Sequence, residues 1–149
     1  MTASIDFHKI NSVKLSQTHY NMTIFKSIFG NSERSPVKNN VLWNHLTDLN
    51  QLDDLIALSK ETPVLIFKHS TNCSVSRMAL KQFENDFDSS LKVTPYFLDL
   101  IAFRLVSNAI AEKFQVTHQS PQLLLIKNGI SVYDVSHNAI DAADLKSKL

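Results

Sequence analysis

Cysteine and glycine are scarce in this chain of 149 residues, which has one cysteine, Cys73, and two glycines, Gly30 and Gly129. One cysteine cannot form a disulfide within the chain, and this suits a reducing compartment. A phosphate-cradling loop and a dinucleotide-binding fingerprint both need several glycines close together, so the sequence excludes both. It also lacks an apolar run as long as a membrane span, and the three regions of a signal peptide at its start. We therefore expect a cytoplasmic protein with no membrane partner.

Charge of either sign is not in excess, because the formal net charge is +1. This balance gives no indication of a nucleic-acid surface or of an acidic substrate, so we expect no nucleic-acid partner. The length suits one domain with enough residues for a real core. We expect the protein to be a monomer.

Residues 1–40 differ from the rest, since they are polar, rich in serine and asparagine, and hold no sustained hydrophobic period. A short apolar stripe at helical spacing lies within 23–29 and is closed by Gly30. We expect 1–40 to be an N-terminal extension that is partly disordered or forms a short helix. Residues 1–21 are expected to be a disordered tail or to precede a natural start at Met22. The folded domain is expected over 41–149.

From residue 41 onward, strand patterns alternate with helix patterns. Strands are predicted over 41–43, 64–67, 92–100, 123–126 and 130–135. Helices are predicted after a cap at Thr47 or Asp48, from Cys73 to Phe87, over 107–114 and over 141–149. The helical spacing predicts that the inward side chains include Leu49, Val75, Met78 and Leu105.

This order of elements predicts parallel strands joined by right-handed crossovers, followed by a hairpin at Asn128-Gly129. A flavodoxin-like fold would not finish in a hairpin. The fold class is therefore α/β and resembles thioredoxin. It has a central mixed sheet flanked by helices and ends in a β-hairpin and a C-terminal helix.

The only cysteine follows an apolar run, Val64 to Phe67, and a polar turn over 68–72. The turn delivers Cys73 to the start of a helix, where unpaired N–H groups and the helix dipole favour a thiolate. Ser76 lies one helical turn later on the same side and can donate a hydrogen bond to that thiolate. The alternative is that Cys73 is a small buried hydrophobic residue, as a lone cysteine often is.

Several motifs over 41–149 resemble one family. They are Phe67-Lys68-His69-Ser70-Thr71-Asn72-Cys73-Ser74-Val75-Ser76, Asp99-Leu100-Ile101-Ala102-Phe103-Arg104, Ser107-Asn108, His118-Gln119-Ser120-Pro121-Gln122, Ile126-Lys127-Asn128-Gly129 and Ser136-His137. The chain resembles the YtxJ-like monothiol bacilliredoxins, which are redox proteins of the bacillithiol system. That family usually has Thr-Cys-Pro-Ile-Ser at the site, whereas here Asn72 precedes the cysteine and Ser74 replaces the proline. The Cys-x-x-Ser frame is intact, but a proline that would pre-set the first helical turn is absent.

The resemblance implies that Cys73 attacks the mixed disulfide between a client protein and bacillithiol or a similar low-molecular-weight thiol. The client thiol leaves, and Cys73 carries the small thiol until a second thiol removes it. The small thiol is thus a co-substrate, and no cofactor is bound tightly. The catalytic residues implied are Cys73 and Ser76, and the substrate-binding residues are Lys68, Asn72, Ser74, His118, Ser120 and Pro121. Pro121 is expected to be a cis proline that faces Cys73, with Ser120 offering its backbone to the ligand.

The sequence is also compatible with two other functions. A monothiol glutaredoxin uses a Cys-x-x-Ser site to hold an iron–sulfur cluster between two subunits, although glycine and phenylalanine stand there in place of Ser74 and Val75. A redox-inactive adaptor with a thioredoxin fold is the other alternative.

Several polar residues also have ordinary structural interpretations. Lys68 could be a solvated lysine at a strand end, His118 a surface residue of its loop, and Ser107 only a residue of a helix start. Asp99 and Arg104 are expected to fix a loop or cap a helix, without a catalytic role. His69, His118 and His137 lack the spacing of metal ligands, so no metal is expected.

Overall fold

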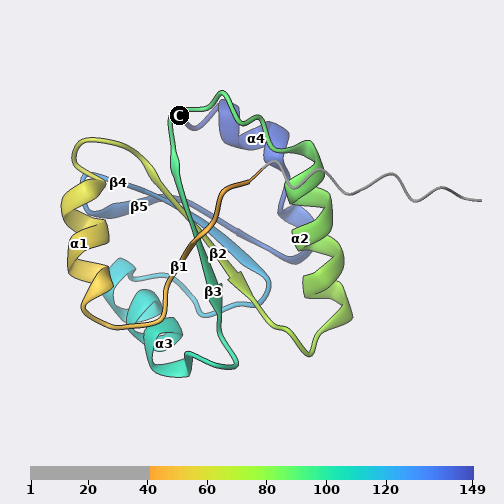
Figure 1. Ribbon diagram of the computed structural model, residues 1–149, viewed down its shortest axis with the longest axis horizontal. Coiled ribbons are helices and arrows are strands. Elements are labelled where there is room, and N and C mark those ends of the chain that lie inside the picture. The colour runs from red at the N-terminus through yellow and green to blue at the C-terminus, as the bar shows by residue number, and fades with distance from the viewer. Residues whose placement is uncertain (1–40) are drawn as a thin grey trace, which may run out of the picture. The chain divides into compact units, whose positions relative to one another are not determined.

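The computed structural model describes residues 41–149, which form a five-stranded sheet with helices on both faces (Figure 1). The predicted N-terminal extension over 1–40, with its apolar stripe and its first 21 residues, lies outside the described residues. The elements in chain order are β1 (Asn44–His45), α1 (Gln51–Leu58), β2 (Val64–His69), α2 (Ser74–Asp86), β3 (Thr94–Asp99), α3 (Arg104–Phe114), β4 (Gln122–Lys127), β5 (Ile130–Ser136), a 3-10 turn η2 (His137–Ala139) and α4 (Ala142–Lys146). None of the helices in this part of the chain has the length and apolar character needed to cross a membrane.

The sheet has the strand order β1-β3-β2-β4-β5, with β2 in the middle. Strand β2 is parallel to β3 and antiparallel to β4, and β5 returns antiparallel beside β4. All six residues of β2 are buried, which explains its continuous apolar run. The predicted mixed sheet, closing hairpin and C-terminal helix are confirmed.

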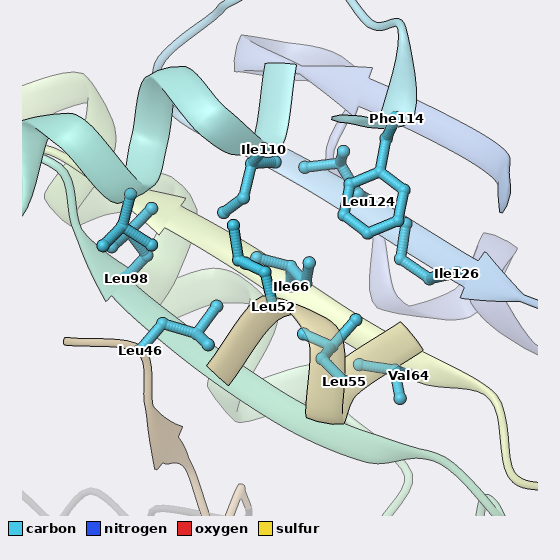
Figure 2. Packing of buried hydrophobic residues seen from close by; sticks show 11 residues of the cluster. Leu46, Leu52, Leu55, Val64, Ile66, Leu98, Ile110, Phe114, Leu124 and Ile126 are labelled. Carbon is cyan, nitrogen blue, oxygen red and sulfur yellow. The ribbon is translucent and has the colours of Figure 1, made fainter. Parts of the chain in front are cut away.

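The alternation of side chains along β2 divides the core into two halves. Val64 and Ile66 face α1 and α3, and Figure 2 shows them with Leu52 and Leu55 of α1 on this side of the sheet. Leu65 and Phe67 belong to the other half, which also contains the α2 and α4 side chains Phe83, Phe87, Ala142 and Leu145. The two helix pairs accordingly lie on opposite faces of the sheet (Figure 1).

The start of the domain differs from the prediction. The first strand is Asn44–His45 rather than 41–43, and Val41 is instead a buried core residue. Helix α1 begins at Gln51 with Asn50 as its N-cap residue, so neither Thr47 nor Asp48 caps it. The side-chain oxygen of Gln51 accepts hydrogen bonds from the backbone N–H groups of both residues, which ties their loop to the helix start.

Three of the side chains predicted to point inward from α2 and α3 are exposed. Met78 is 72% exposed, Leu105 is 73% exposed and Val75 is 45% exposed. Helix α3 begins at Arg104, three residues earlier than predicted, and its buried row is Val106, Ile110 and Phe114. Leu105 lies about 100° around the helix from Val106, because each residue of an α-helix turns by that angle. Leu49 precedes α1 and is also exposed.

The hairpin at Asn128-Gly129 is confirmed, and both residues have positive φ angles, 51° and 79°. This is the backbone of a two-residue turn that matches the twist of its strands. The turn is also anchored to the end of α1, since the N–H groups of Asn128 and Gly129 donate to the carbonyl and hydroxyl of Ser59.

Replacing Gly129 with alanine should lower the free energy of unfolding by about 1–2 kcal/mol, because a side chain is strained at this positive φ. The new Cβ would also lie 3.3 Å from Cγ2 of Ile56. Asn128→Gly is the matched control and should change stability by less than about 0.5 kcal/mol, since glycine accepts the same φ. Urea unfolding measures both, and an unchanged midpoint for the alanine variant would contradict the prediction.

Candidate functional site

Cys73 is the N-cap residue of α2, directly after the turn that leaves β2. Its backbone is extended, its thiol is partly exposed, and its side chain makes no capping hydrogen bond. The sulfur therefore lies at a helix end where unpaired N–H groups and the dipole favour negative charge. The predicted placement of Cys73 at a helix N-terminus is confirmed, and a residue of the buried core is excluded.

The residues on either side of Cys73 are both exposed, Asn72 in the turn and Ser74 at the first position of α2. A serine can begin this helix in place of the family's proline, because the N–H at that position has no partner within the helix in any case. The turn is held from α2, since Arg77 Nη1 donates to the carbonyl of Thr71 at 3.1 Å. The predicted contacts of Asn72 and Ser74 with a substrate stay predictions.

Ser76 is fully buried, and its hydroxyl joins the end of β2 to α2. Its Oγ accepts a hydrogen bond from the N–H of Ser70 at 3.0 Å and lies 2.8 Å from Nδ1 of His69. A hydroxyl has one proton, so Ser76 can offer it to a sulfur only when the His69 ring donates at Nδ1. The proposed donation to Cys73 stays a prediction, whereas the bonds that fix the turn are present.

Among the predicted site residues, Lys68 differs most from what the sequence led us to expect. It belongs to β2 rather than to the polar turn and is 0% exposed, so the interpretation as a solvated lysine is wrong. Its Nζ donates to Oε1 of Gln122 at 3.0 Å. Burial, and secondarily the positive charge of Arg104, lowers the pKa of Lys68 from 10.5 to about 8. Register places these partners directly opposite each other on β2 and β4.

Gln122 extends this contact into the loop that precedes β4. Its Nε2 donates to the carbonyl of Thr117 at 2.9 Å, and its Oε1 also accepts from the N–H of Gln119 at 3.2 Å. The peptide bond between Ser120 and Pro121 is cis, as predicted. Because Lys68 pairs with Gln122, Pro121 lies next to the end of β2 from which the Cys73 turn departs.

The same loop is held from β5 and η2 by His137. The backbone N–H of His137 donates to the carbonyl of Pro121 at 3.1 Å, and the ring Nε2 lies 3.1 Å from Oε1 of Gln119. In contrast, the hydroxyl oxygen of Ser120 is buried and has no hydrogen-bond partner in the described part of the chain. The loop backbone is thus fixed, while one buried polar atom in it stays unsatisfied.

His118 and Ser107 form a contact between the loop and α3, with Nε2 and Oγ 2.9 Å apart. Ser107 lies near the start of α3, as predicted, and it is also fully buried and in contact with His118. Burial lowers the pKa of His118, and the positive charges of Lys68 and Arg104 lower it further. His118 is therefore not a free surface histidine.

Four residues of this network were not assigned a role from the sequence, namely His69, Ser107, Gln122 and His137. Gln122 stands out in the sequence as a polar residue between Pro121 and an apolar run. Its partner, Lys68, could not be predicted because the pairing depends on strand register. Asp99 fixes a loop as expected, because its Oδ1 accepts from the N–H groups of Ile101 and Ala102. Among residues 41–149 there is no group of three His, Cys, Asp or Glu side chains suited to a metal ion.

Stability is expected to fall as the pH drops below about 6.5, the ordinary pKa of histidine. Burial lowers the folded-state pKa of both His69 and His118, so the unfolded chain binds protons more readily in this range. Urea unfolding at pH 7.5, 6.5 and 5.5 measures the effect. His118→Gln should show a smaller fall than the wild type, and identical profiles for the two proteins would contradict the prediction for His118.

Solved structures of proteins with a thioredoxin fold are similar to this chain. A solved structure described as a candidate oxidoreductase with a thioredoxin fold is 31% identical, with a TM-score of 0.60 over 69% of this chain and 89% of that chain. Thioredoxin from Fasciola hepatica is 20% identical, with a TM-score of 0.55 over 70% of this chain and 94% of its own. Thioredoxin from Malassezia sympodialis is also 20% identical, with a TM-score of 0.54 over 72% and 87%. The two thioredoxins show the fold alone.

The family model for the monothiol bacilliredoxin BrxC matches residues 44–145, from β1 to the last helix. The match includes Cys73 at the start of α2, the cis Ser120-Pro121 bond and the buried contacts around them. It supports a role in thiol oxidoreduction and interactions that involve thiols. The chain belongs to the monothiol bacilliredoxin family.

Proposed function

We propose that this protein removes bacillithiol, or a similar low-molecular-weight thiol, from mixed disulfides of client proteins. The observation that carries the proposal is the position of Cys73, a partly exposed thiol at the N-terminus of α2 and the only cysteine of the chain. Disulfide exchange needs an accessible thiolate, and a helix N-terminus supplies favourable electrostatics for one.

In the first step, the Cys73 thiolate attacks the bacillithiol sulfur of the mixed disulfide. The bond between the client and bacillithiol breaks, a bond between Cys73 and bacillithiol forms, and the client sulfur leaves as a thiolate that takes up a proton. In the second step, an external thiol attacks the bacillithiol sulfur and releases Cys73. The second thiol must come from outside because the chain has no other cysteine. The small thiol is the co-substrate, and no resident cofactor takes part.

The surface around Cys73 suits contact with a protein client. Val75 and Met78 on the first turns of α2 are exposed and line a groove with His137. Ile101 and Leu105, on the connection after β3 and on α3, are exposed as well. Because β2 and β3 are parallel, the connections that follow them leave the same edge of the sheet (Figure 1). A contiguous exposed apolar patch marks a surface that binds other proteins, and these four side chains are our candidates for such a patch.

Intact mass spectrometry of the reduced full-length chain after incubation with oxidised bacillithiol tests the proposal. One bacillithiol should be added, on Cys73, and a Cys73→Ser variant should gain nothing. The modified protein should then be restored by a second thiol. A wild-type chain that stays unmodified, or a Cys73 that is alkylated no faster than free cysteine at pH 6, would contradict the proposal and favour a redox-inactive adaptor. An iron–sulfur absorbance spectrum after anaerobic reconstitution would instead favour a cluster carrier.

A further inference from the structure

Three basic side chains gather on the α3 side of the edge that carries Cys73. Lys68 ends the buried row of β2 on this side, and Arg104 is the exposed first residue of α3. His118 connects the two, since its loop is held to β4 and its ring bonds to Ser107 in the first turns of α3. We name these residues the basic edge cluster: Lys68, Arg104 and His118.

The contacts bring the cluster together from three elements. Lys68 Nζ bonds to Gln122, and Gln122 in turn holds the carbonyl of Thr117, the residue directly before His118. The charges act on one another across this arrangement. Arg104 lowers the pKa of Lys68, and both cations lower the pKa of His118. Arg104 also lies three residues, or one helical turn, before Ser107 on α3, the residue that the His118 ring contacts.

None of the hydrogen bonds found for these three side chains in residues 41–149 is to a carboxylate. Lys68 donates to an amide oxygen, and His118 contacts a hydroxyl. The carboxylate at the end of β3, Asp99, accepts from two backbone N–H groups, and its charge acts on His69, which points to the α2 side. No carboxylate is thus found to pair with the cluster. Burying a cation without a counter-charge costs free energy, and a bound anion would offset that cost.

Hydrogen-bonding capacity at this edge is also unused. A lysine ammonium has three N–H donors, and one bond, to Gln122, is found for Lys68. The hydroxyl oxygen of Ser120, two residues after His118 in the same loop, is the one buried side-chain nitrogen or oxygen in the described residues without a partner. Buried polar groups are normally satisfied by a protein, water or ligand group, so Ser120 Oγ has the capacity for one more partner.

We propose that the basic edge cluster binds a carboxylate of the small thiol while the sulfur of that thiol is joined to Cys73. The inference rests on the proposed function, which supplies the mixed disulfide. Lys68 is the next-to-last residue of β2, five residues before Cys73, and the His118 loop ends at the cis proline beside β2, so cluster and sulfur share one edge. Arg104 and His118 contact the carboxylate, while Lys68 acts through its charge from below the surface. The site thus selects small thiols that carry carboxylates over neutral or cationic ones.

The test compares the equilibrium constants for mixed disulfides between Cys73 and four small thiols. Mercaptosuccinate has two carboxylates, mercaptoacetate has one, and mercaptoethanol has none. The fourth thiol, cysteamine, carries a positive charge. Each constant is divided by that of the same thiol with a free cysteine derivative, which removes intrinsic thiol reactivity. Mercaptosuccinate should exceed mercaptoethanol by about tenfold, the ratio that corresponds to about 1.4 kcal/mol. Mercaptoacetate should be intermediate, and cysteamine should be weakest.

Lys68→Met and Arg104→Gln should each reduce this preference several-fold, whereas Lys113→Gln should preserve it. Lys113 is the matched control because it lies in the last turn of the same helix, α3. Arg77→Gln removes a cation on the α2 side of the Cys73 turn, the one that bonds to Thr71. Equal constants for all four thiols, or a preference that only Arg77→Gln removes, would overturn the inference and leave the exchange reaction intact.

A second measurement does not depend on disulfide chemistry. Succinate is titrated into the Cys73→Ser variant, and backbone amide shifts are followed by NMR against sodium chloride at equal ionic strength. Saturable shifts at Ser107, His118 and Ser120, lost in Arg104→Gln, would support the carboxylate site even if Cys73 formed no mixed disulfide. Shifts no larger than those in sodium chloride would overturn it.

Discussion

Replacing Lys68 with methionine is expected to raise the free energy of unfolding at pH 7 by about 3 kcal/mol, since each pKa unit corresponds to about 1.4 kcal/mol. Lys68 is fully buried, and its pKa is lowered from 10.5 to about 8. The folded state therefore disfavours the ammonium that the unfolded chain carries freely. Methionine is unbranched and can occupy the same space beside Leu98. Gln122 Oε1 keeps a partner, because it also accepts from the N–H of Gln119.

The pH dependence identifies the cause. Between about pH 8 and pH 10.5 the unfolded chain keeps the Lys68 proton while the folded protein loses it, so wild-type stability should gain relative to the variant as the pH rises. Below pH 8 both states are protonated, and the difference between the proteins should be constant. Urea unfolding of both proteins from pH 7 to pH 10 gives the comparison.

Lys113→Met is the control for loss of one positive charge. Lys113 is on the surface in an ion pair with Asp53, and such pairs contribute about 0–1 kcal/mol. A Lys68→Met protein less stable than the wild type at pH 7 would show that the buried ammonium is well compensated. That result would also remove the argument that the basic edge cluster lacks an anion. A stable variant with weakened selectivity would instead show that Lys68 is kept for function.

Replacing Ser76 with alanine is expected to lower the free energy of unfolding by about 2–4 kcal/mol, at about 1–2 kcal/mol for each of the two groups that lose their partner. The variant leaves the N–H of Ser70 and Nδ1 of His69 without the Ser76 oxygen. Ser76 is fully buried and His69 is 5% exposed, so water cannot readily replace that oxygen. Urea unfolding at pH 7.5 measures the loss.

Ser74→Ala is the matched control, because Ser74 is exposed at the start of the same helix. It should change stability by less than about 0.5 kcal/mol, as is usual for surface positions. Alkylation of Cys73 under native conditions then separates the two roles of Ser76. An unchanged rate per folded molecule would assign Ser76 to structure alone, whereas a slower rate would support donation to the sulfur. Equal stability of both variants would contradict the buried network.

Much of the fold could be predicted from local pattern. The apolar run after Pro63 predicted a central strand, because a strand covered on both faces needs no polar positions. Asn128-Gly129 predicted the hairpin, because few residues adopt two consecutive positive φ angles. The faces of α2 and α3 could not be predicted as well. Helical spacing alone does not tell which of two adjacent rows of side chains on a helix is buried. In α3 the row that packs against the sheet contains Val106 and not Leu105.

The sequence by itself determined the chemistry that this protein has available. A single cysteine after a strand and before a helix excludes an internal disulfide and sets the sulfur at a helix N-terminus. The family resemblance further implied the cis proline that the structure contains. These features depend on residues close together in the chain, or on a motif, and both can be read without a structure.

Only the tertiary structure decided what surrounds that sulfur. Lys68 and Gln122 are 54 residues apart in sequence, and strand register joins them. The net charge of +1 gave no sign of an anion site, because composition averages over the surface, whereas folding gathers three basic groups at one edge. The polarity of Lys68 suggested a solvated turn, but its position in a six-residue strand between two others buried it. Long-range pairing sets both burial and charge proximity, and local sequence carries neither.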